Sequence, residues 1–493
     1  MESVLIRRLL TGGALLAALV LGWDLANGDY LLLSLAGSLA ILLVAHWVTK
    51  LDSDVFLGGL VLFGYLVGNR GFAQLQIPGL PLLPGEAVLG IGICLAIWRA
   101  ARTKALPIRR DALNLTILAW IAVGLARLPY DFRTYSFVAA RDFASIYYAL
   151  FFYLAQGWAE SPRNRAWLTG CLTAGLALTT LAFAAFDRWP MFFLSLTVAG
   201  SPLIYVKSDV AGGFMAAGVL WFGWRFLQAR HWLWLALMTL CALGVLFCNS
   251  RASVLALSLG AVGLVMLREW RLLRILLTLG ALGGGALLGE ALWPRPPGES
   301  SQVFRLYESV RSIADFSGSR TPTSSDLGDK PDNNRFRLVW WETVLNDARD
   351  HGPWLGLGFG YDLADQFVRT YYADSDEEFS TRSPHNFFIT VFARMGLIGL
   401  VLFGAILVAM TSHTIRAAFA APNSGASTPW LFSWIILITA CFGVVLEGPM
   451  GAVLFWTMLG LANASLRQAI GDEPATAPAL QPVEQPGEIA AAP

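Results

Sequence analysis

The residues best suited to chemistry in this sequence are one histidine and several arginines in its second half. His385 stands where a polar, acidic segment gives way to an apolar run, in TRSPHNFFITVFARMGLIGL (381–400). A neutral imidazole there can accept a proton near pH 7 and so activate a hydroxyl group. Ser383 and Pro384 are also typical of a helix start, so a purely structural role for His385 is an equal alternative.

The arginines indicate a phosphate-binding site. Arg251, in CNSRASVLAL, lies between two apolar runs that leave almost no loop. An arginine at that depth needs either a partner or a side chain that snorkels to the headgroups. The topology described below puts further cations on the same side: Arg141, Lys207, Arg335 and Arg337. Guanidinium groups hold phosphate through paired hydrogen bonds, so a membrane-level cluster of them suits a lipid pyrophosphate.

Some of these features have simpler explanations. Arg141 is followed by Asp142, and Lys207 precedes Asp209 by two residues, so each pair can be self-neutralising. The GLGFG stretch at 356–360 resembles a phosphate loop, but no strand precedes it and no lysine follows. At most it forms an amide nest for an anion.

Two acids at the ends of apolar runs have several possible roles. Glu290 and Glu447 can line a polar cavity, bind a sugar hydroxyl or cap a helix. The sequence alone does not separate these roles.

The composition places all these residues in a membrane protein. Of 493 residues, 56% are hydrophobic and only 14% are charged, and the net charge is +1. Soluble domains are less apolar and carry more charge. Apolar runs recur along the chain, and about 20 helical residues span the hydrocarbon core. Because the runs are continuous rather than alternating, we predict an all-α, polytopic bundle of membrane helices.

Fourteen spans are predicted. They lie near 9–23, 30–48, 54–69, 86–101, 112–128, 143–158, 166–186, 211–228, 232–248, 252–267, 272–293, 386–411, 429–446 and 450–466. Prolines and charges flank the apolar segment 190–206, so we expect a short interfacial or re-entrant piece there. With the N-terminus in the cytoplasm, this count leaves every short basic loop inside, as the positive-inside rule requires.

The domain organisation follows from these spans. We predict an N-terminal membrane bundle (1–293), a large outer loop with helices (294–384), C-terminal membrane helices (385–466) and a disordered cytoplasmic tail (467–493). In the loop, residues 335–351 predict a helix with Trp341, Val344 and Leu345 on one face. Gly352 and Pro353 end that helix.

Four short motifs, in this order, resemble the O-antigen ligase and polymerase superfamily. They are SR (250–251), RLVWW (337–341), PWLGLGFG (353–360) and HNFFITVFARMGLIGL (385–400). The resemblance covers about 210–410. The first half adds only an RD-x5-Y-like stretch with Arg141, Asp142 and Tyr148.

The resemblance implies a GT-C-like glycosyltransferase of the bacterial cell inner membrane, with its active site facing the periplasm. Members of the family transfer a glycan from undecaprenyl pyrophosphate to a sugar hydroxyl, without a metal or another cofactor. His385 matches the family's essential histidine and Arg251 its membrane-level arginine. Arg337 matches the loop arginine, and Arg335, two positions earlier, is the alternative. One departure is the span count, about 14 here against roughly a dozen in the family.

The predicted site therefore has three catalytic residues and five that bind substrate. The catalytic residues are His385, Arg251 and Arg337, and the substrate-binding residues are Arg335, Arg141, Lys207, Asp209 and Asn386. The cations would stabilise the departing pyrophosphate, and the imidazole would remove the proton of the acceptor hydroxyl. Direct displacement at the anomeric carbon predicts inversion.

Several alternatives remain open at this point. The acceptor is either lipid A-core or a growing polysaccharide chain, and no nucleic acid is expected as a partner. A different class of function is a lipid-linked oligosaccharide flippase or transporter, which needs polar groups through the depth of the bundle. A third is another lipid-sugar glycosyltransferase with its catalytic acid at Asp24 or Asp29.

Overall fold

The structure, a computed structural model, describes residues 46–76, 82–104, 108–198, 200–248, 250–292, 301, 303, 304, 307, 329–371, 382–420 and 425–470. The predicted span 9–23, nearly all of 30–48, and the acids Asp24 and Asp29 lie outside this part of the chain, as does the tail after 470. Within it the chain is almost entirely helical, and its one sheet is a hairpin of β1 (Thr197–Val198) and β2 (Ser201–Pro202). This confirms the all-α class.

Seven of the described helices are long and apolar enough to cross a membrane. They are α5 (Pro84–Thr103), α6 (Ala112–Tyr135), α10 (Pro162–Arg188), α12 (Ser208–Ala229), α15 (Trp270–Leu292), α19 (Phe387–Ala420) and α21 (Pro449–Ile470). A further apolar pair, bent by 43°, consists of α7 (Phe137–Asp142) and α8 (Ala144–Tyr147) together with α9 (Leu150–Trp158), and has the length and composition of a broken span or a re-entrant loop.

Four shorter apolar helices complete the bundle. They are α3 (Ser53–Val67), α13 (Trp232–Phe247), α14 (Arg251–Met266) and α20 (Thr428–Ala440). Every span predicted from residue 54 onward falls on one of these helices or on the bent pair. The total of 14 spans stays a prediction, because the first two lie outside the described residues.

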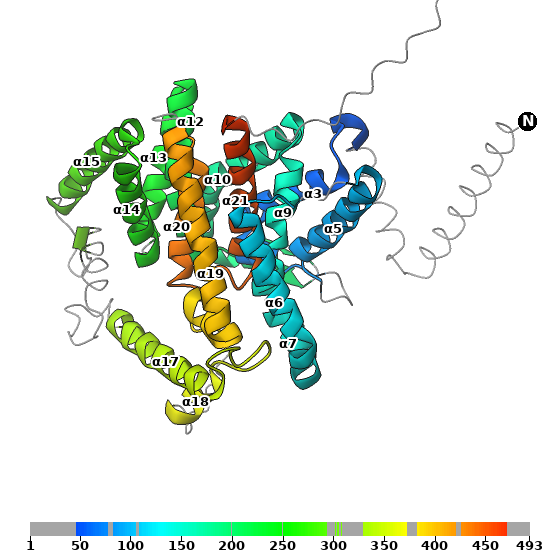
Figure 1. Cartoon of the computed structure of the whole chain (residues 1–493). Helices are drawn as coiled ribbons and strands as arrows, with labels where there is room; N and C mark the ends of the chain where they lie inside the picture. Colours follow the sequence, from blue (N-terminus) through cyan, green and yellow to red (C-terminus); the bar gives the residue numbers. More distant parts are fainter. Residues whose placement is uncertain are drawn as a thin grey trace, which may run out of the picture.

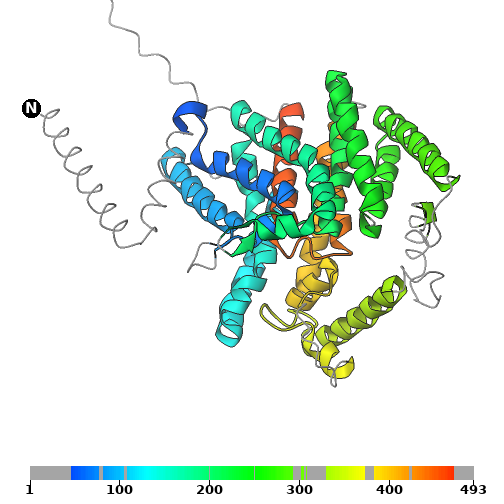
Figure 2. The same ribbon diagram turned by 180° about the vertical axis from the view of Figure 1, so that it is seen from behind.

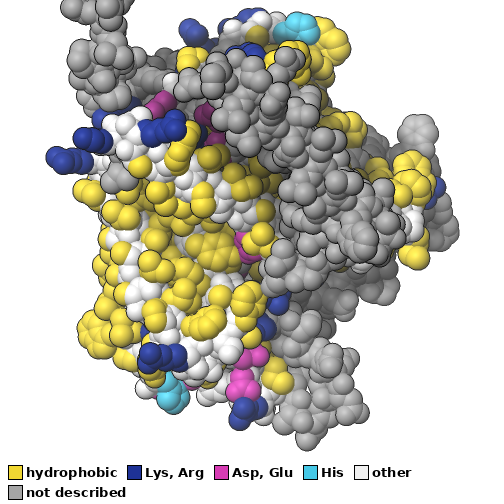
Figure 3. All heavy atoms as spheres, turned by 90° about the vertical axis from the view of Figure 1, so that its right-hand side faces the viewer, with side chains coloured by type: hydrophobic (Ala, Val, Ile, Leu, Met, Phe, Trp, Pro, Cys, Tyr) yellow, Lys and Arg dark blue, Asp and Glu magenta, His cyan; other side chains and the backbone are white. Residues whose placement is uncertain are grey.

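Burial separates central helices from peripheral ones. In α12 and α21, 78% and 89% of the apolar window is buried, against 22% in α5 and 12% in α15, which lie at the two sides of the bundle in Figures 1 and 2. Figure 3 shows a broad apolar band on one face, with Lys and Arg side chains gathered at both of its ends. A band of this kind suits a hydrocarbon core flanked by headgroups.

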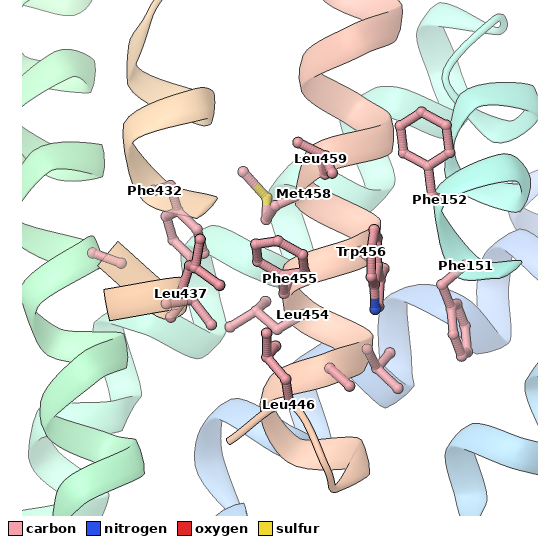
Figure 4. Packing of buried hydrophobic residues seen from close by; sticks show 14 of the residues in the cluster. Phe151, Phe152, Phe432, Leu437, Leu446, Leu454, Phe455, Trp456, Met458 and Leu459 are labelled. Atoms are coloured by element: carbon pink, nitrogen blue, oxygen red, sulfur yellow. The ribbon is translucent and has the colours of Figure 1, made fainter. Parts of the chain in front are cut away.

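The centre of the bundle is packed with aromatic side chains. Trp456 and Phe455 of α21 lie between Phe432 of α20 and Phe152 of α9, and all four are fully buried (Figure 4). Because these rings come from helices far apart in the sequence, they fix how the two halves of the bundle pack.

Close approach of α12 to its neighbours depends on small residues. A Cβ at Gly212 would lie 2.1 Å from Ser253 Oγ of α14, and one at Gly213 would lie 2.9 Å from the Thr439 side chain of α20. Small residues at such contacts are how helices pack tightly in lipid. The start of α12, with Lys207 and Asp209, is therefore held against α14 and α20.

The segment 190–206 does not form a spanning helix. It consists of the six-residue α11 (Pro190–Ser195) and the β1–β2 hairpin, as expected from its flanking prolines and charges. Tyr205 exchanges backbone hydrogen bonds of 3.2 Å with Gly68 and Gly71, at α4 (Asn69–Ala73). The Lys207 N–H donates to Asn69 Oδ1 at 3.0 Å. These bonds fix the residues that lead into α12.

A second, smaller core lies under the loop helices α17 (Asp329–His351) and α18 (Asp365–Tyr371). Trp340, Val344 and Ala348 of α17 pack on Ile389 and Ala393 in the first turns of α19. These α17 residues follow one another at intervals of four, which keeps them on one helix face.

The face predicted for this helix was partly wrong. Val344 is buried as expected, but Leu345 is 39% exposed and the buried tryptophan is Trp340 rather than Trp341. The indole N–H of Trp341 instead donates to the Pro384 carbonyl at 2.6 Å, directly before His385. The helix ends before Gly352, as predicted.

Candidate active site

The candidate site lies where α12, α14 and α19 begin and where α17 crosses the end of the bundle (Figures 1 and 2). Each of these helices contributes or borders one of the residues singled out from the sequence. The loop 441–448, between α20 and α21, closes the site from the bundle side.

His385 occupies a strained backbone position. Its φ angle of 58° is in the left-handed region, which costs a non-glycine residue of order 1–3 kcal/mol and is often found at functional sites. Its N–H donates to Ser383 Oγ in a long contact of 3.4 Å, and its ring packs edge-on against Trp340 with centroids 6.0 Å apart. His385 therefore lies in a turn just before α19 begins, and its imidazole is on the side of the candidate site.

The electrostatic surroundings keep His385 neutral. The pKa of its imidazole is lowered to about 4, first by burial and then by the positive charges of Arg337 and Lys207, which together outweigh the opposing effect of Asp209. A neutral imidazole can accept a proton, so the group is available as a base at pH 7.

Arg337 connects the loop helix to the bundle. Its guanidinium donates to the Phe442 carbonyl at 2.9 Å, and its charge interacts with Asp209 and with Arg251. Lys207 Nζ lies 3.1 Å from Asp209 Oδ2, so this pair is indeed self-neutralising, as one sequence interpretation had it.

Arg251 is the first residue of α14, directly after the N-cap Ser250. Ser250 Oγ accepts a hydrogen bond from the Ser253 N–H at 3.4 Å, which fixes the start of the helix. The SR motif therefore combines a cap with a partly buried arginine on which the charge of Arg337 acts. His385 and Arg251 are both within range of the Arg337 charge, which places them at the same end of the bundle.

Glu447 is the site residue that sequence reasoning left undecided. Its Oε1 accepts hydrogen bonds of 2.8 Å from both Ser383 and Thr390, and so ties together the two sides of the His385 turn. Its Oε2 is buried and has no hydrogen-bond partner among the described residues. Burial raises the pKa of this carboxyl, which favours its neutral, protonated form. An acid after an apolar run was the only sequence signal for it.

Several cations lie near the imidazole. The charges of Arg337 and Lys207 act on His385, the charge of Arg337 also acts on Arg251, and Lys207 pairs with Asp209. Cations beside a neutral imidazole suit an anionic group and a proton donor bound together. In the described part of the chain, no three His, Cys, Asp or Glu side chains are grouped so that they could hold a metal ion.

Three predicted substrate-binding residues differ in what the structure shows of them. Asn386 Oδ1 accepts hydrogen bonds from the N–H groups of Phe388 and Ile389, at 3.0 and 3.3 Å, and so caps α19. Arg141 is exposed on α7. The side chain of Arg335 lies outside the described part of the structure. Roles in substrate binding for all three stay predictions.

The GLGFG loop binds the protein's own carboxylates. The Phe359 N–H donates to Asp131 at 2.8 Å, and the Gly360 N–H donates to Asp142 at 3.0 Å. These two amides therefore are not open to a phosphate, and the idea of a free amide nest here was wrong. Asp142 also does not serve to neutralise Arg141, because it pairs with Arg394 at 2.8 Å.

Arg394 connects the GLGFG loop to Asp142. It is 4% exposed, and besides Asp142 it donates to the carbonyls of Gly358 and Tyr361, at 3.0 and 2.5 Å. Arg382 donates to the Gly360 carbonyl at 2.9 Å. The sequence offered a signal, an arginine inside an apolar run, but nothing in it indicated the partners.

The same loop fits into a break in α19. At Gly396, φ is 64° and ψ is −159°, and the helix is interrupted. The N–H groups of Leu397 and Ile398 donate to the Pro353 and Trp354 carbonyls, at 2.9 and 3.2 Å. A Cβ at Gly396 would lie 2.3 Å from Trp354, so only glycine permits this approach. The PWLGLGFG and ARMGLIGL motifs thus bind each other and hold α17 above the site.

Residues 236–404 match the family model described as O-antigen ligase. This stretch of the chain is therefore similar to the O-antigen ligase family. The matched stretch includes Arg251, Arg337, His385, the GLGFG loop and the break at Gly396, and its extent agrees with the resemblance seen at about 210–410. A search of curated proteins finds no match to the chain.

The family match and the fold indicate the general type of activity. The similarity to O-antigen ligases and the apolar helices support a membrane protein of the glycosyltransferase-like ligase or polymerase type. Lipid-linked glycans and saccharide acceptors are the substrates of such proteins in general. Lys207, Asp209 and Glu447 lie outside the matched residues, and the structure brings them to the domain from flanking helices.

Proposed function

We propose that the protein transfers an oligo- or polysaccharide from undecaprenyl pyrophosphate to a sugar hydroxyl, at the periplasmic face of the inner membrane. The acceptor is lipid A-core or a growing polysaccharide chain. The observation that carries the proposal is the convergence of His385 with Arg251, Arg337 and Lys207 at one end of the bundle. A base and a set of phosphate-binding cations are what this reaction needs.

In the proposed reaction, His385 removes the proton of the acceptor hydroxyl while its oxygen attacks the anomeric carbon. The bond from that carbon to the pyrophosphate breaks, and the lipid pyrophosphate leaves with the electron pair. Arg251, Arg337 and Lys207 stabilise the charge that develops on it. This direct displacement inverts the anomeric centre and uses no metal ion.

Donor binding also prepares the base. The free protein holds the pKa of His385 at about 4, in part through Arg337 and Lys207. A pyrophosphate beside those cations offsets their charge, so the imidazole pKa rises towards the range in which a general base is most effective. The imidazole therefore becomes a stronger base when the leaving group is in place.

The test is a transfer assay with purified protein, a lipid-pyrophosphate glycan and an acceptor saccharide. We expect His385→Ala to lower the rate about 10²–10⁴-fold, and Arg251→Ala about 10²–10³-fold. His351→Ala and Arg349→Ala are matched controls, because both side chains are exposed on α17, and both should retain the wild-type rate. Full activity of the His385 and Arg251 variants would refute the assigned roles.

Two further readouts separate the remaining possibilities. Anomeric configuration of the product, measured by NMR, tests inversion, and addition of a chelator tests metal independence. In a deletion strain, long chains left on the lipid carrier indicate a ligase, whereas single repeat units indicate a polymerase. Lipid-linked glycan that crosses vesicles without transfer would instead support the flippase alternative.

A further inference from the structure

A second polar site lies at the opposite end of the bundle from His385. The helix α12 runs for 22 residues from Ser208, beside the active site, to Ala229, which is about 33 Å along its axis. Beside its last turn, a groove of about 580 Å³ opens between the junction of α12 with α13 and the first turns of α15. We call it the arginine groove.

Three arginines line one part of this groove: Arg230, Arg271 and Arg274. Arg271 and Arg274 are three residues apart on α15 and share a helix face. Arg230 ends α12 in a left-handed conformation, with φ at 51°. All three side chains are exposed, whereas Glu269, the acid nearest in sequence, is 1% exposed and accepts a hydrogen bond from Ser427.

The other part of the groove is apolar. Ile275, Leu279 and Leu282 continue the face of Arg271 along α15, and Leu227 and Leu235 lie on the opposite wall. From Arg271 to Leu282 the helix rises about 16 Å, which is roughly half the thickness of the hydrocarbon core. Only 12% of the α15 window is buried and the helix lies at the edge of the bundle (Figure 1), so we expect lipid beside it.

We propose that the arginine groove binds an anionic phospholipid. The three guanidiniums hold its phosphate, and an acyl chain lies along Ile275, Leu279 and Leu282. Guanidinium groups bind phosphate oxygens through paired hydrogen bonds, and basic pockets between membrane helices are typical sites for anionic headgroups. A soluble anion would fill only the charged part and leave the apolar part empty, so the shape and charge of the groove favour a lipid.

The test compares ligands on the purified full-length protein in neutral detergent. Binding of phosphatidylglycerol, phosphatidylcholine and inorganic phosphate is measured by native mass spectrometry and by the shift in Tm. We expect phosphatidylglycerol to bind and to raise the Tm, phosphatidylcholine to bind more weakly, and inorganic phosphate to leave the Tm unchanged.

A pair of matched variants locates the site. Arg271→Gln/Arg274→Gln should weaken phosphatidylglycerol binding about thirtyfold, given the usual contribution of two arginines at a membrane surface. Arg163→Gln/Arg165→Gln also removes two arginines from the first turn of a spanning helix, α10, and should leave binding unchanged.

Three outcomes would overturn the proposal. Equal losses in both variants would show nonspecific attraction to the membrane surface, and equal binding of both lipids would show that the arginines only snorkel. A Tm shift with inorganic phosphate would indicate a soluble anion as the ligand. None of these measurements uses glycan transfer, so they test lipid binding independently of the proposed function.

Discussion

Replacement of Arg394 by methionine tests whether the GLGFG loop is held by a buried ion pair. The change removes the 2.8 Å pair with Asp142 and the hydrogen bonds to the Gly358 and Tyr361 carbonyls, while it keeps an unbranched side chain in the space. Breaking a buried pair by removing one partner costs about 3–5 kcal/mol, because the other charge stays buried. We therefore expect the free energy of unfolding to fall by about that amount.

The matched control is Arg369→Met. Arg369 also pairs with an aspartate at 2.8 Å, Asp365, but its side chain is 78% exposed. Exposed pairs of this type contribute about 0–1 kcal/mol. Both variants are measured by denaturant titration in detergent micelles, followed by tryptophan fluorescence, together with the glycan transfer rate.

A double-mutant cycle completes the test. If Arg394 and Asp142 interact as described, Arg394→Met/Asp142→Asn should be less destabilised than the sum of the single changes, by about 1–3 kcal/mol. The reasoning would be refuted if Arg394→Met cost no more than Arg369→Met. Additive single changes would show that Arg394 acts through the two carbonyls and not through Asp142.

Three further predictions concern the base, the Glu447 bridge and the helix break. Lys207→Met removes a cation that lowers the pKa of His385, so the acidic limb of the kcat/KM profile, near pH 4 in the wild type, should move towards higher pH; an unchanged limb would contradict the electrostatic account. Glu447→Gln keeps an acceptor for its two hydroxyl partners and should retain kcat within about threefold, whereas Glu447→Ala should lower kcat about tenfold or more with little change in KM. Gly396→Ala should lower the free energy of unfolding by at least about 2 kcal/mol, because of its positive φ and its contact with the loop, while Gly404→Ala in the same helix has open space and should be tolerated; equal stabilities would argue against the interlocked break.

Much of the architecture was predictable because hydropathy depends only on local sequence. The apolar helices from residue 54 onward, the short piece at 190–206 and the end of α17 before Gly352 all follow from apolar length, charge and proline. The bend between α8 and α9 was not predicted, since no residue there forbids a straight helix. The inward face of α17 was misjudged by one position, because two adjacent tryptophans fit the same periodicity.

The candidate site was predictable as a set of residue types and not as a set of partners. The membrane topology predicted from the basic loops put His385, Arg251, Arg337 and Lys207 on one side of the membrane. In the structure these residues lie at the same end of the bundle, within range of one another's electrostatic influence. The contacts of Arg394 could not be predicted, because its partners lie far from it in the sequence. No local sequence pattern links Arg394 to these partners.

The first turns of α19, before the break at Gly396, belong to two cores at once. Ile389 and Ala393 pack under α17, while Phe387 and Val391 pack into the main bundle. The outer helix therefore cannot detach without disturbing the turn that carries the imidazole. Partial unfolding at α17 would therefore change the position of His385 and remove the cover above it in the same step.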